Sequence, residues 1–185
     1  KHEINYYRGS ENNVLERFID AGKKFNLTRI IRVCADNPFL SIPDLDFLIQ
    51  KFKNSDLDYL SFQTSNSVPV IKTQYGFWAE GVSLHALSKI KKYTNSRIYL
   101  EHVTNYIYEN LQQFHTEFIN IDPYIEKNNH IRMTLDTHED YLFLKEIYNK
   151  YVKIEEKTLR SLVALVSENK IWLNKMNIQI LKNKK

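Results

Sequence analysis

The sequence predicts an α/β domain in which helices flank a mixed, mostly parallel sheet. Segments of strand character alternate with segments of helical period along most of the chain, which is the pattern of βαβ units. The 185 residues suit one such domain, and 43% of them are hydrophobic, which is enough to build a core. We therefore expect one α/β domain over 1–152, followed by a helical extension over 153–185.

The first part of the chain is expected to alternate helix, strand and helix. Apolar residues at helical spacing predict a helix over 13–24, and Asn12 or Asn13 is a suitable N-cap. A β-rich apolar run predicts a strand over 29–35. Pro43 then fits the first turn of the next helix, because the N–H that proline lacks is unpaired at a helix start.

The middle of the chain continues the alternation. Residues 58–63 are expected to form a strand with aromatic and leucine side chains. Residues 68–80 are expected to be extended, with Gly76 as a bend or a point of close backbone approach. Helical spacing of apolar residues then predicts helices over 81–91 and 100–110.

The last part is expected to add two strands and three helices. Residues 114–121 and 131–135 have strand character, and each is followed by an aspartate. Helical periodicity covers 137–151. Two further helices, around 154–168 and 170–182, are expected to close the chain.

Composition narrows the class of protein. Cys34 is the only cysteine, so no disulfide can form within the chain, which fits a reducing cytoplasm. The sequence has no apolar stretch of about 18 residues and no signal peptide, so we expect a cytoplasmic protein without a membrane partner. The net charge is +4, but it is concentrated in 145–185, so the rest offers no basic surface for nucleic acid.

Several common catalytic motifs are missing. The sequence has no Gly-x-Gly-x-x-Gly and no P-loop, which argues against a Rossmann dehydrogenase and a P-loop kinase. It has no Gly-x-Ser-x-Gly elbow of a hydrolase. His130 and His138 lack metal-ligand spacing with each other or with cysteine, so zinc is not expected.

Asp36 is the first candidate site residue. It ends the strand in Arg-Val-Cys-Ala-Asp-Asn-Pro-Phe-Leu, residues 32–40, because Asn37-Pro38 prevents a regular continuation. Ligands of open α/β sheets bind beyond the carboxyl ends of strands, where a carboxylate commonly holds Mg²⁺ with nucleotide phosphates. The alternative is that Asp36 only starts a turn before the next helix.

Asp136 is the second candidate, because another expected strand runs directly into it. Two carboxylates at one edge of a sheet can share a divalent ion that bridges phosphate oxygens. The alternative is helix capping, with Asp136 or Thr137 as the N-cap and Glu139 or Asp140 three positions later. Capping explains one aspartate of the pair but not why both strands end in one.

A turn at Arg8-Gly9-Ser10 leads into the helix that Asn13 is suited to cap. Backbone N–H groups at a helix start favour an anion such as a nucleotide phosphate, and Gly9 would permit close approach. A plain surface turn is the alternative.

Glu101-His102 is expected to open a helix. The pair is suited to a hydroxylated substrate or to acid–base chemistry, because histidine titrates near neutral pH. The alternative is that the lone histidine is a surface residue.

Four blocks, in this order, resemble the acylneuraminate-type cytidylyltransferases, and in particular the spore coat polysaccharide biosynthesis cytidylyltransferases of bacterial surface-glycan synthesis. The blocks are Tyr7–Ser10 with Asn13–Phe18, Arg32–Phe39, Glu101–Ile107 and Ile131–Asp140. Together they cover most of residues 4–150. Their joint occurrence is much more specific than any one of them.

The resemblance implies a nucleotide-diphospho-sugar transferase fold of the GT-A-like type and transfer of CMP from CTP to an acidic sugar, with release of pyrophosphate. It implies that Asp36 binds Mg²⁺ near the CTP phosphates and that Asp136 is the second catalytic, metal-linked carboxylate. The other residues that it assigns are Arg8, Gly9, Ser10 and Asn13 for the nucleotide and Glu101, His102 and Arg132 for the sugar. Related enzymes are often dimers, so it also implies a homodimer.

The chain departs from the family at its start. Family members begin with a strand and a loop of glycine, arginine and lysine that grips the triphosphate, and nothing like it stands here. We expect a chain that begins inside the domain and leaves a sheet edge open. We also expect it to be a poor catalyst alone, because phosphoryl-type transfer depends on such basic groups.

Two other functions stay open. A nucleotide-sugar-dependent glycosyltransferase would share the fold, but that class usually carries an Asp-x-Asp metal motif, and Asp44-Leu45-Asp46 lies in an expected helix. The other is a non-catalytic remnant or interaction protein that kept the fold and lost the loop. The sequence upstream of Lys1 would separate the three.

Overall fold

The computed structural model describes residues 4–182 and divides the chain into two compact units. Unit 1 comprises Lys1–Arg32, Leu48–Leu60 and Glu80–Glu117, and unit 2 comprises Val33–Phe47, Ser61–Ala79 and Phe118–Lys185. The chain therefore passes from one unit to the other repeatedly. The expected domain boundary after residue 152 stays a prediction.

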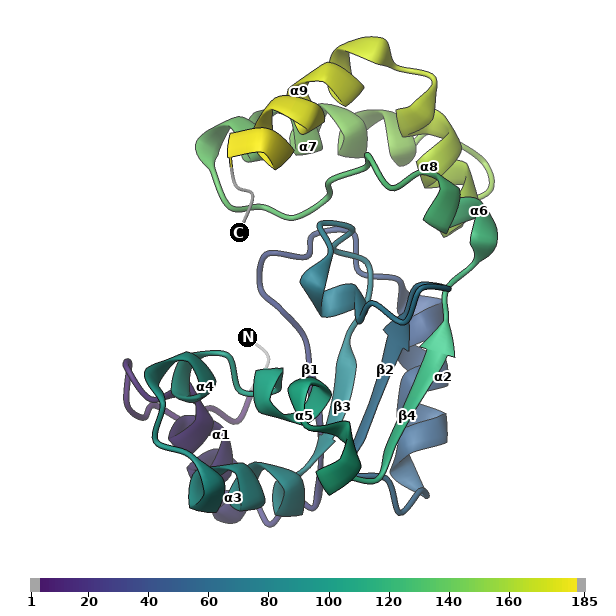
Figure 1. The fold of residues 1–185 in the computed structure, drawn as a ribbon. Helices are drawn as coiled ribbons and strands as arrows, with labels where there is room; N and C mark the ends of the chain where they lie inside the picture. Colours follow the sequence, from purple (N-terminus) through teal and green to yellow (C-terminus); the bar gives the residue numbers. More distant parts are fainter. Residues whose placement is uncertain (1–3, 183–185) are drawn as a thin grey trace. The chain divides into compact units, whose positions relative to one another are not determined.

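Four strands form one sheet in the part of the chain that the structure describes, in the order β1-β3-β2-β4 (Figure 1). They are β1 (Arg29–Arg32), β2 (Tyr59–Gln63), β3 (Glu80–Ser83) and β4 (Thr116–Asn120). β3 is antiparallel to both of its neighbours.

β2 and β4 run parallel to each other. The N–H of Asp58 donates to the carbonyl of His115 at 2.7 Å. Further along both strands, the N–H of Ile121 donates to the carbonyl of Gln63 at 2.9 Å. Residue numbers therefore increase in the same direction along both strands, as in a parallel pair. β1, β2 and β4 thus share one direction, and the expected α/β fold with a mixed sheet is confirmed.

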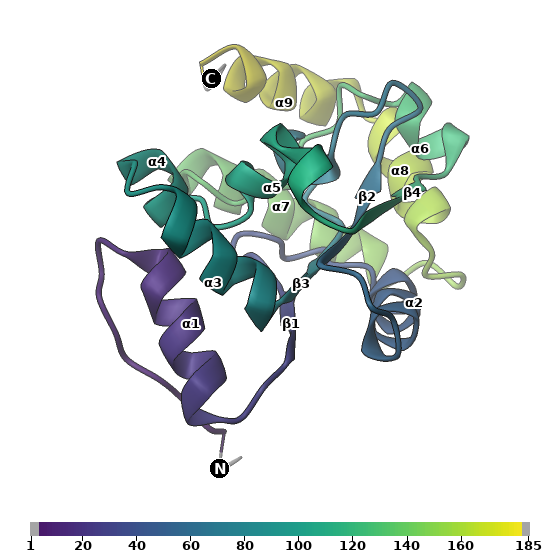
Figure 2. The same cartoon turned by 60° about the horizontal axis from the view of Figure 1, so that its bottom comes forward.

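Helices cover both faces of β3 in unit 1. Successive side chains of a strand point to opposite faces, so Gly81 and Glu80 lie on different faces of β3. On one face, a Cβ added to Gly81 would lie 2.7 Å from the ring of Phe52 in α2 (Ile42–Lys53). On the other face, Glu80 contacts Thr104. Figure 2 shows α2 on one side of these strands and α3 and α5 on the other.

The remaining helices of unit 1 are α1 (Val14–Lys24), α3 (Leu84–Tyr93), α4 (Arg97–Glu101) and α5 (Asn105–Glu109), with a 3-10 turn η2 (Leu111–Gln113). α1 packs on α3 and α4. Gly22 allows the close approach, since an added Cβ would lie 2.7 Å from Leu84. Asn13 is the N-cap of α1 as expected, and its side chain accepts from the N–H of Glu16 at 3.0 Å.

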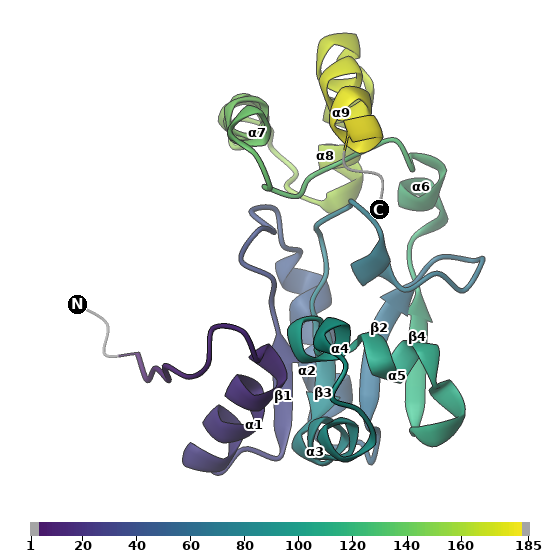
Figure 3. The same cartoon turned by 60° about the vertical axis from the view of Figure 1, so that its left-hand side comes forward.

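Unit 2 is mainly helical. Its helices are α6 (Pro123–Lys127), α7 (His138–Tyr151), α8 (Leu159–Ser167) and α9 (Lys170–Lys182), and the loop after β2 holds a 3-10 turn η1 (Val70–Lys72). α7, α8 and α9 pack on one another, and α8 also packs on α6 (Figure 3). Phe143, Ile147 and Trp172 are buried in this group. None of the helices between residues 4 and 182 is long and apolar enough to cross a membrane.

Three expected helices are wrong in their limits. The helix expected around 154–168 is α8, which starts only at Leu159 and ends at Ser167. The segment 81–91 begins as strand β3, and its helix starts only at Leu84, where Ser83 accepts from the N–H of Ala86. Every residue from 77 to 83 is buried, as in a central strand. Such a segment shows no alternation of polar and apolar residues that would predict a strand. The segment 100–110 is divided between α4 and α5.

Two expected extended segments are also wrong. Residues 68–80 contain η1 and an irregular loop in which Gly76 adopts a φ of 66°. Residues 131–135 belong to no strand of the sheet. They are held by single backbone hydrogen bonds to two different loops, from Met133 to Gln74 and from Leu135 to Asp36.

Candidate functional site

The strand expected over 29–35 is wrong at its end, because β1 stops at Arg32 and Asp36 lies in a turn of unit 2. The N–H of Asn37 donates to the carbonyl of Cys34 at 3.3 Å, and the N–H of Leu135 donates to the carbonyl of Asp36 at 2.8 Å. The second bond holds this turn against the segment that leads into Asp136. The structure therefore brings the backbones of the two predicted metal ligands close together, although 131–135 is not a strand.

Asp136 is about half exposed and already has partners. Its Oδ2 accepts from the guanidinium of Arg132 at 2.5 Å and from the hydroxyl of Thr134 at 2.9 Å. Arg132 is only 3% exposed and also contacts Asp140. The guanidinium of Arg132 thus binds two carboxylates of its own chain, and its role toward a sugar stays a prediction.

Asp140 fixes the start of α7. Its fully buried carboxylate accepts from the backbone N–H groups of Asp136 and Thr137 at 3.0 and 2.9 Å, and from Arg132 at 3.3 and 3.1 Å. Thr137 accepts from the N–H of Asp140 at 3.1 Å, so the capping box is present with Thr137 as N-cap. Burial alone would raise the pKa of Asp140, but these hydrogen bonds outweigh it and lower the pKa. Asp140 is a fixed negative charge beside Arg132.

The donor set at this turn suits one kind of Mg²⁺ site. Between residues 4 and 182, no group of three or more His, Cys, Asp or Glu side chains is placed to hold a metal. Mg²⁺ is usually bound through one or two carboxylates together with substrate phosphates. The carboxylates of Asp36 and Asp136 have the chemistry for that role, and their binding of Mg²⁺ stays a prediction.

The predicted nucleotide turn in unit 1 is exposed at Arg8, Gly9 and Ser10. The hydroxyl of Ser10 accepts from the N–H of Asn13 at 3.1 Å, which closes the turn onto the first residues of α1. The guanidinium of Arg8 lies 5.8 Å from the centre of the Tyr6 ring. The turn is built from local contacts, and nucleotide binding by these residues stays a prediction.

Glu101 and His102 close a helix and do not open one. Glu101 is the last residue of α4 and is exposed, while His102 is the C-cap and is half-buried. The helix ends here because the next two residues, Val103 and Thr104, are each only 1% exposed and turn into the core. The contact of the pair with a sugar stays a prediction.

A buried polar cluster in unit 1 is centred on Glu80, which sequence reasoning missed. Glu80 is 2% exposed, and its Oε1 accepts from Arg32 at 2.6 Å and from the Thr104 hydroxyl at 2.9 Å. Its Oε2 accepts from the hydroxyl of Tyr59. Burial raises the pKa of Tyr108 strongly, and the charge of Glu80 adds to this, so Tyr108 is neutral.

The Glu80 cluster joins β1, β2 and β3 to Thr104, which lies two residues after His102. The signal for it is a lone acidic residue inside the apolar run 77–83. An ionised side chain is buried only with partners, so that glutamate required a cation such as Arg32 in a neighbouring strand.

The family is decided by comparison with known proteins. A family model described as Cytidylyltransferase matches residues 1–178. This chain belongs to the cytidylyltransferase family. An uncharacterised protein of Methanocaldococcus jannaschii is 31% identical over 166 residues, which are 90% of this chain and 64% of that protein. The spore coat polysaccharide biosynthesis protein SpsF of Bacillus subtilis is 29% identical over 172 residues, which are 91% of this chain and 67% of SpsF.

The cytidylyltransferase chain thus spans about two thirds of the length of these two relatives. A solved structure of a cytidylyltransferase from Leptospira borgpetersenii serovar Hardjo-bovis matches with a TM-score of 0.72 at 23% identity. The match covers 97% of this chain and 69% of that one, and it shows a shared fold. The family and fold expected from the four sequence blocks are confirmed.

Proposed function

We propose that this cytidylyltransferase transfers CMP from CTP to an acidic sugar, with release of pyrophosphate, in the synthesis of a surface polysaccharide. The observation that carries the proposal is the pairing of the Asp36 turn with the Asp136 segment in a chain that matches the family over residues 1–178. The polysaccharide context is supported by the likeness to SpsF. The proposal includes a cytoplasmic location and a homodimer.

In this reaction a sugar hydroxyl attacks the α-phosphorus of CTP, and the bond to the β-phosphate oxygen breaks. Mg²⁺, when bound, would offset the charge of the phosphate oxygens. Asp36 and Asp136 would hold it. Arg132 orients Asp136 from a buried position, because its guanidinium is itself fixed by Asp140. Asp36, Asp136 and Arg132 would contribute by positioning the reacting groups, which is most of what phosphoryl-type transfer requires.

The proposal also assigns residues of unit 1, which is described here by itself. We place Arg8, Gly9, Ser10 and Asn13 at the nucleotide and Glu101 and His102 at the sugar. The support is that the turn at residues 8–10 is exposed and that α1 begins four residues after it, at Val14. The N-terminal end of a helix favours a phosphate group.

Isothermal titration calorimetry with CTP and Mg²⁺ tests the proposal. We expect Asp36→Asn to weaken CTP binding by at least about tenfold, or roughly 1.4 kcal/mol. Asp46→Asn, which makes the same charge change at an exposed position of α2, should leave binding unchanged. Equal binding by the wild type and Asp36→Asn would overturn the metal assignment. Tighter binding of UTP or of a nucleotide sugar would overturn the cytidylyltransferase reaction.

A further inference from the structure

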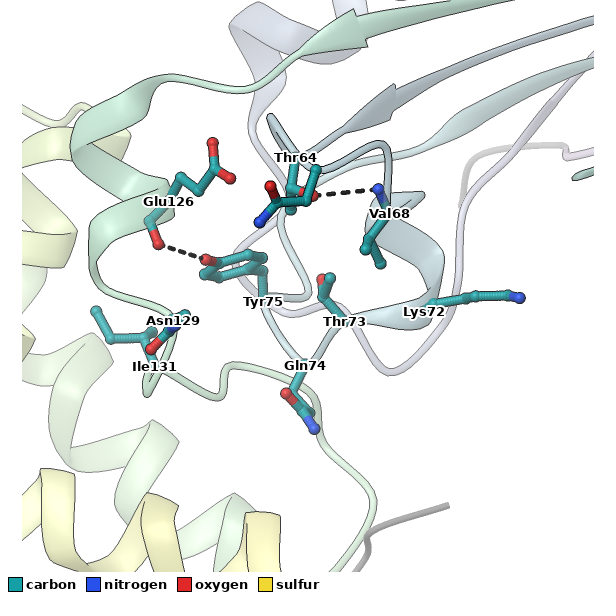
Figure 4. Close-up of a pocket in the computed structure, with 10 residues that line it drawn as sticks. Thr64, Val68, Lys72, Thr73, Gln74, Tyr75, Glu126, Asn129 and Ile131 are labelled. Atoms are coloured by element: carbon teal, nitrogen blue, oxygen red, sulfur yellow. Dashed lines mark hydrogen bonds between the residues drawn. The ribbon is translucent and has the colours of Figure 1, made fainter.

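Unit 2 contains a polar pocket of about 270 Å³ that the assignments above do not use (Figure 4). It lies between the loop that follows β2 and the region of α6. The polar side chains that line it are Thr64, Asn66, Thr73, Gln74, Glu126 and Asn129, and Tyr75 lies beside them.

Tyr75 gives the pocket a rigid base. It is 3% exposed, and its ring packs edge-on against Trp78 with centroids 5.7 Å apart. Its hydroxyl donates to the backbone carbonyl of Glu126 at 3.2 Å (Figure 4). Opposite walls are also tied together, because a carboxylate oxygen of Glu126 accepts from the N–H and the hydroxyl of Ser65 at 2.9 and 2.7 Å. The pocket is therefore formed before any ligand enters.

The pocket is joined to the Asp36 and Asp136 segments by the backbone. The N–H of Met133 donates to the carbonyl of Gln74 at 2.9 Å. Gly76 permits this approach, since a Cβ there would lie 2.9 Å from the carbonyl oxygen of Met133. Met133 precedes Asp136 by three residues, which span at most about 10 Å. The Gln74 side of the pocket therefore lies close, along the backbone, to the segment that carries Asp136.

Most of the polar side chains in the lining are uncharged. Hydroxyls and side-chain amides both donate and accept hydrogen bonds, which matches a polyol or an N-acyl group. Among the described residues that line the pocket, Glu126 is acidic and Lys72 is basic, and Figure 4 shows the Lys72 side chain extending away from the others. A carboxylate inside the pocket would face Glu126.

We propose that this pocket binds the uncharged, hydroxyl- and amide-bearing part of the sugar substrate, remote from the hydroxyl that attacks CTP. The inference rests on the proposed function. An acidic sugar would then bind through two separate parts. Its neutral end would lie inside the pocket, and its carboxylate would stay outside.

Titration of the ¹⁵N-labelled chain with N-acetylglucosamine, followed by NMR, tests the inference. We expect shifts concentrated in 64–76 and 126–131, with a dissociation constant on the order of 1 mM for so small a ligand. Glucuronic acid is a single small ring without an amide, so a molecule that fills the pocket brings its carboxylate inside. It should bind at least about fivefold more weakly, because that carboxylate is repelled by Glu126. Asn129→Asp should weaken binding of the neutral sugar about fivefold, while Asn95→Asp, an exposed site outside the pocket, should not.

The inference is overturned if the pocket signals do not move, if glucuronic acid binds as well as the neutral sugar, or if Asn129→Asp has no effect. The CTP titration separates this failure from that of the proposed function. If CTP binding depends on Asp36 and the NMR signals of the pocket residues do not shift, the pocket inference is wrong and the proposed function stands. If the neutral sugar binds but CTP does not, the proposed function falls and the pocket loses its role as part of that substrate site.

Discussion

The buried pair of Arg132 and Asp140 predicts a large loss of stability in Asp140→Asn. The carboxylate of Asp140 is fully buried and accepts hydrogen bonds from Arg132 and from two backbone N–H groups. Asparagine keeps one oxygen acceptor but turns an amide donor toward the guanidinium. Removing one partner of a buried ion pair costs about 3–5 kcal/mol. That is a large share of the roughly 5–15 kcal/mol that stabilises a typical domain.

Urea denaturation followed by far-ultraviolet circular dichroism measures this loss. Glu139→Gln is the matched control, since it removes the same charge from the neighbouring, exposed residue in the first turn of α7. We expect the control to cost less than about 1 kcal/mol, the scale of a charge at a helix start. If Asp140→Asn and Glu139→Gln differ by less than about 1 kcal/mol, the ion pair does not stabilise the fold as argued.

The pH dependence gives an independent check on Asp140. Its pKa is lower in the folded protein than the unperturbed value of 3.8. A lowered pKa stabilises the fold above the unfolded-state value, and the contribution is lost as the pH falls through the folded-state value. The stability difference between the wild type and Asp140→Asn should therefore be full near neutral pH and shrink below about pH 4. A difference that stays constant down to pH 3 would contradict the assignment.

Three further changes test the packing. Glu80→Gln leaves Arg32 beside a neutral amide in the core and should cost about 3 kcal/mol in urea denaturation; a cost below about 0.5 kcal/mol would show that the cluster is energetically neutral. Gly76→Ala forces a positive φ and a clash with the backbone of Met133, so it should cost at least about 1–3 kcal/mol, whereas Gly9→Ala meets only the side chains of Tyr7 and Arg17 and should cost clearly less. Thr137→Ala removes the N-cap of α7 and should cost about 1 kcal/mol, and an unchanged midpoint would argue against the capping box.

The sequence predicted best those elements whose signals are local. α1 and α7 were predicted to within a residue or so, because each has an amphipathic period and a polar N-cap. β3 was missed because it is a central strand. Its residues, Glu-Gly-Val-Ser, are all buried, so the sequence shows no polar–apolar alternation there, and the strands that pair with it lie far away along the chain.

The candidate site was predictable only in part. The proximity of Asp36 and Asp136 was expected from two strand ends, yet it arises from one backbone hydrogen bond between a turn and an irregular segment. The partners of Glu80 could not be paired from sequence, because they come from two other strands and a helix connection. The pocket proposed for the sugar carries no motif, since most of its lining consists of common side chains from the loop after β2 and from the region of α6.

The two interpretations of Asp136, metal ligand and helix cap, describe one arrangement. Thr137 and Asp140 cap the helix, and Asp140 also takes the N–H of Asp136 and holds Arg132, which in turn holds the carboxylate of Asp136. Capping therefore fixes the orientation of the proposed metal ligand. Asp140→Asn should weaken binding of CTP with Mg²⁺ under conditions where the protein is still folded, by less than Asp36→Asn does, and Glu139→Gln should not. If calorimetry shows unchanged CTP affinity in folded Asp140→Asn, the cap stabilises α7 alone and Asp136 does not depend on it for its orientation.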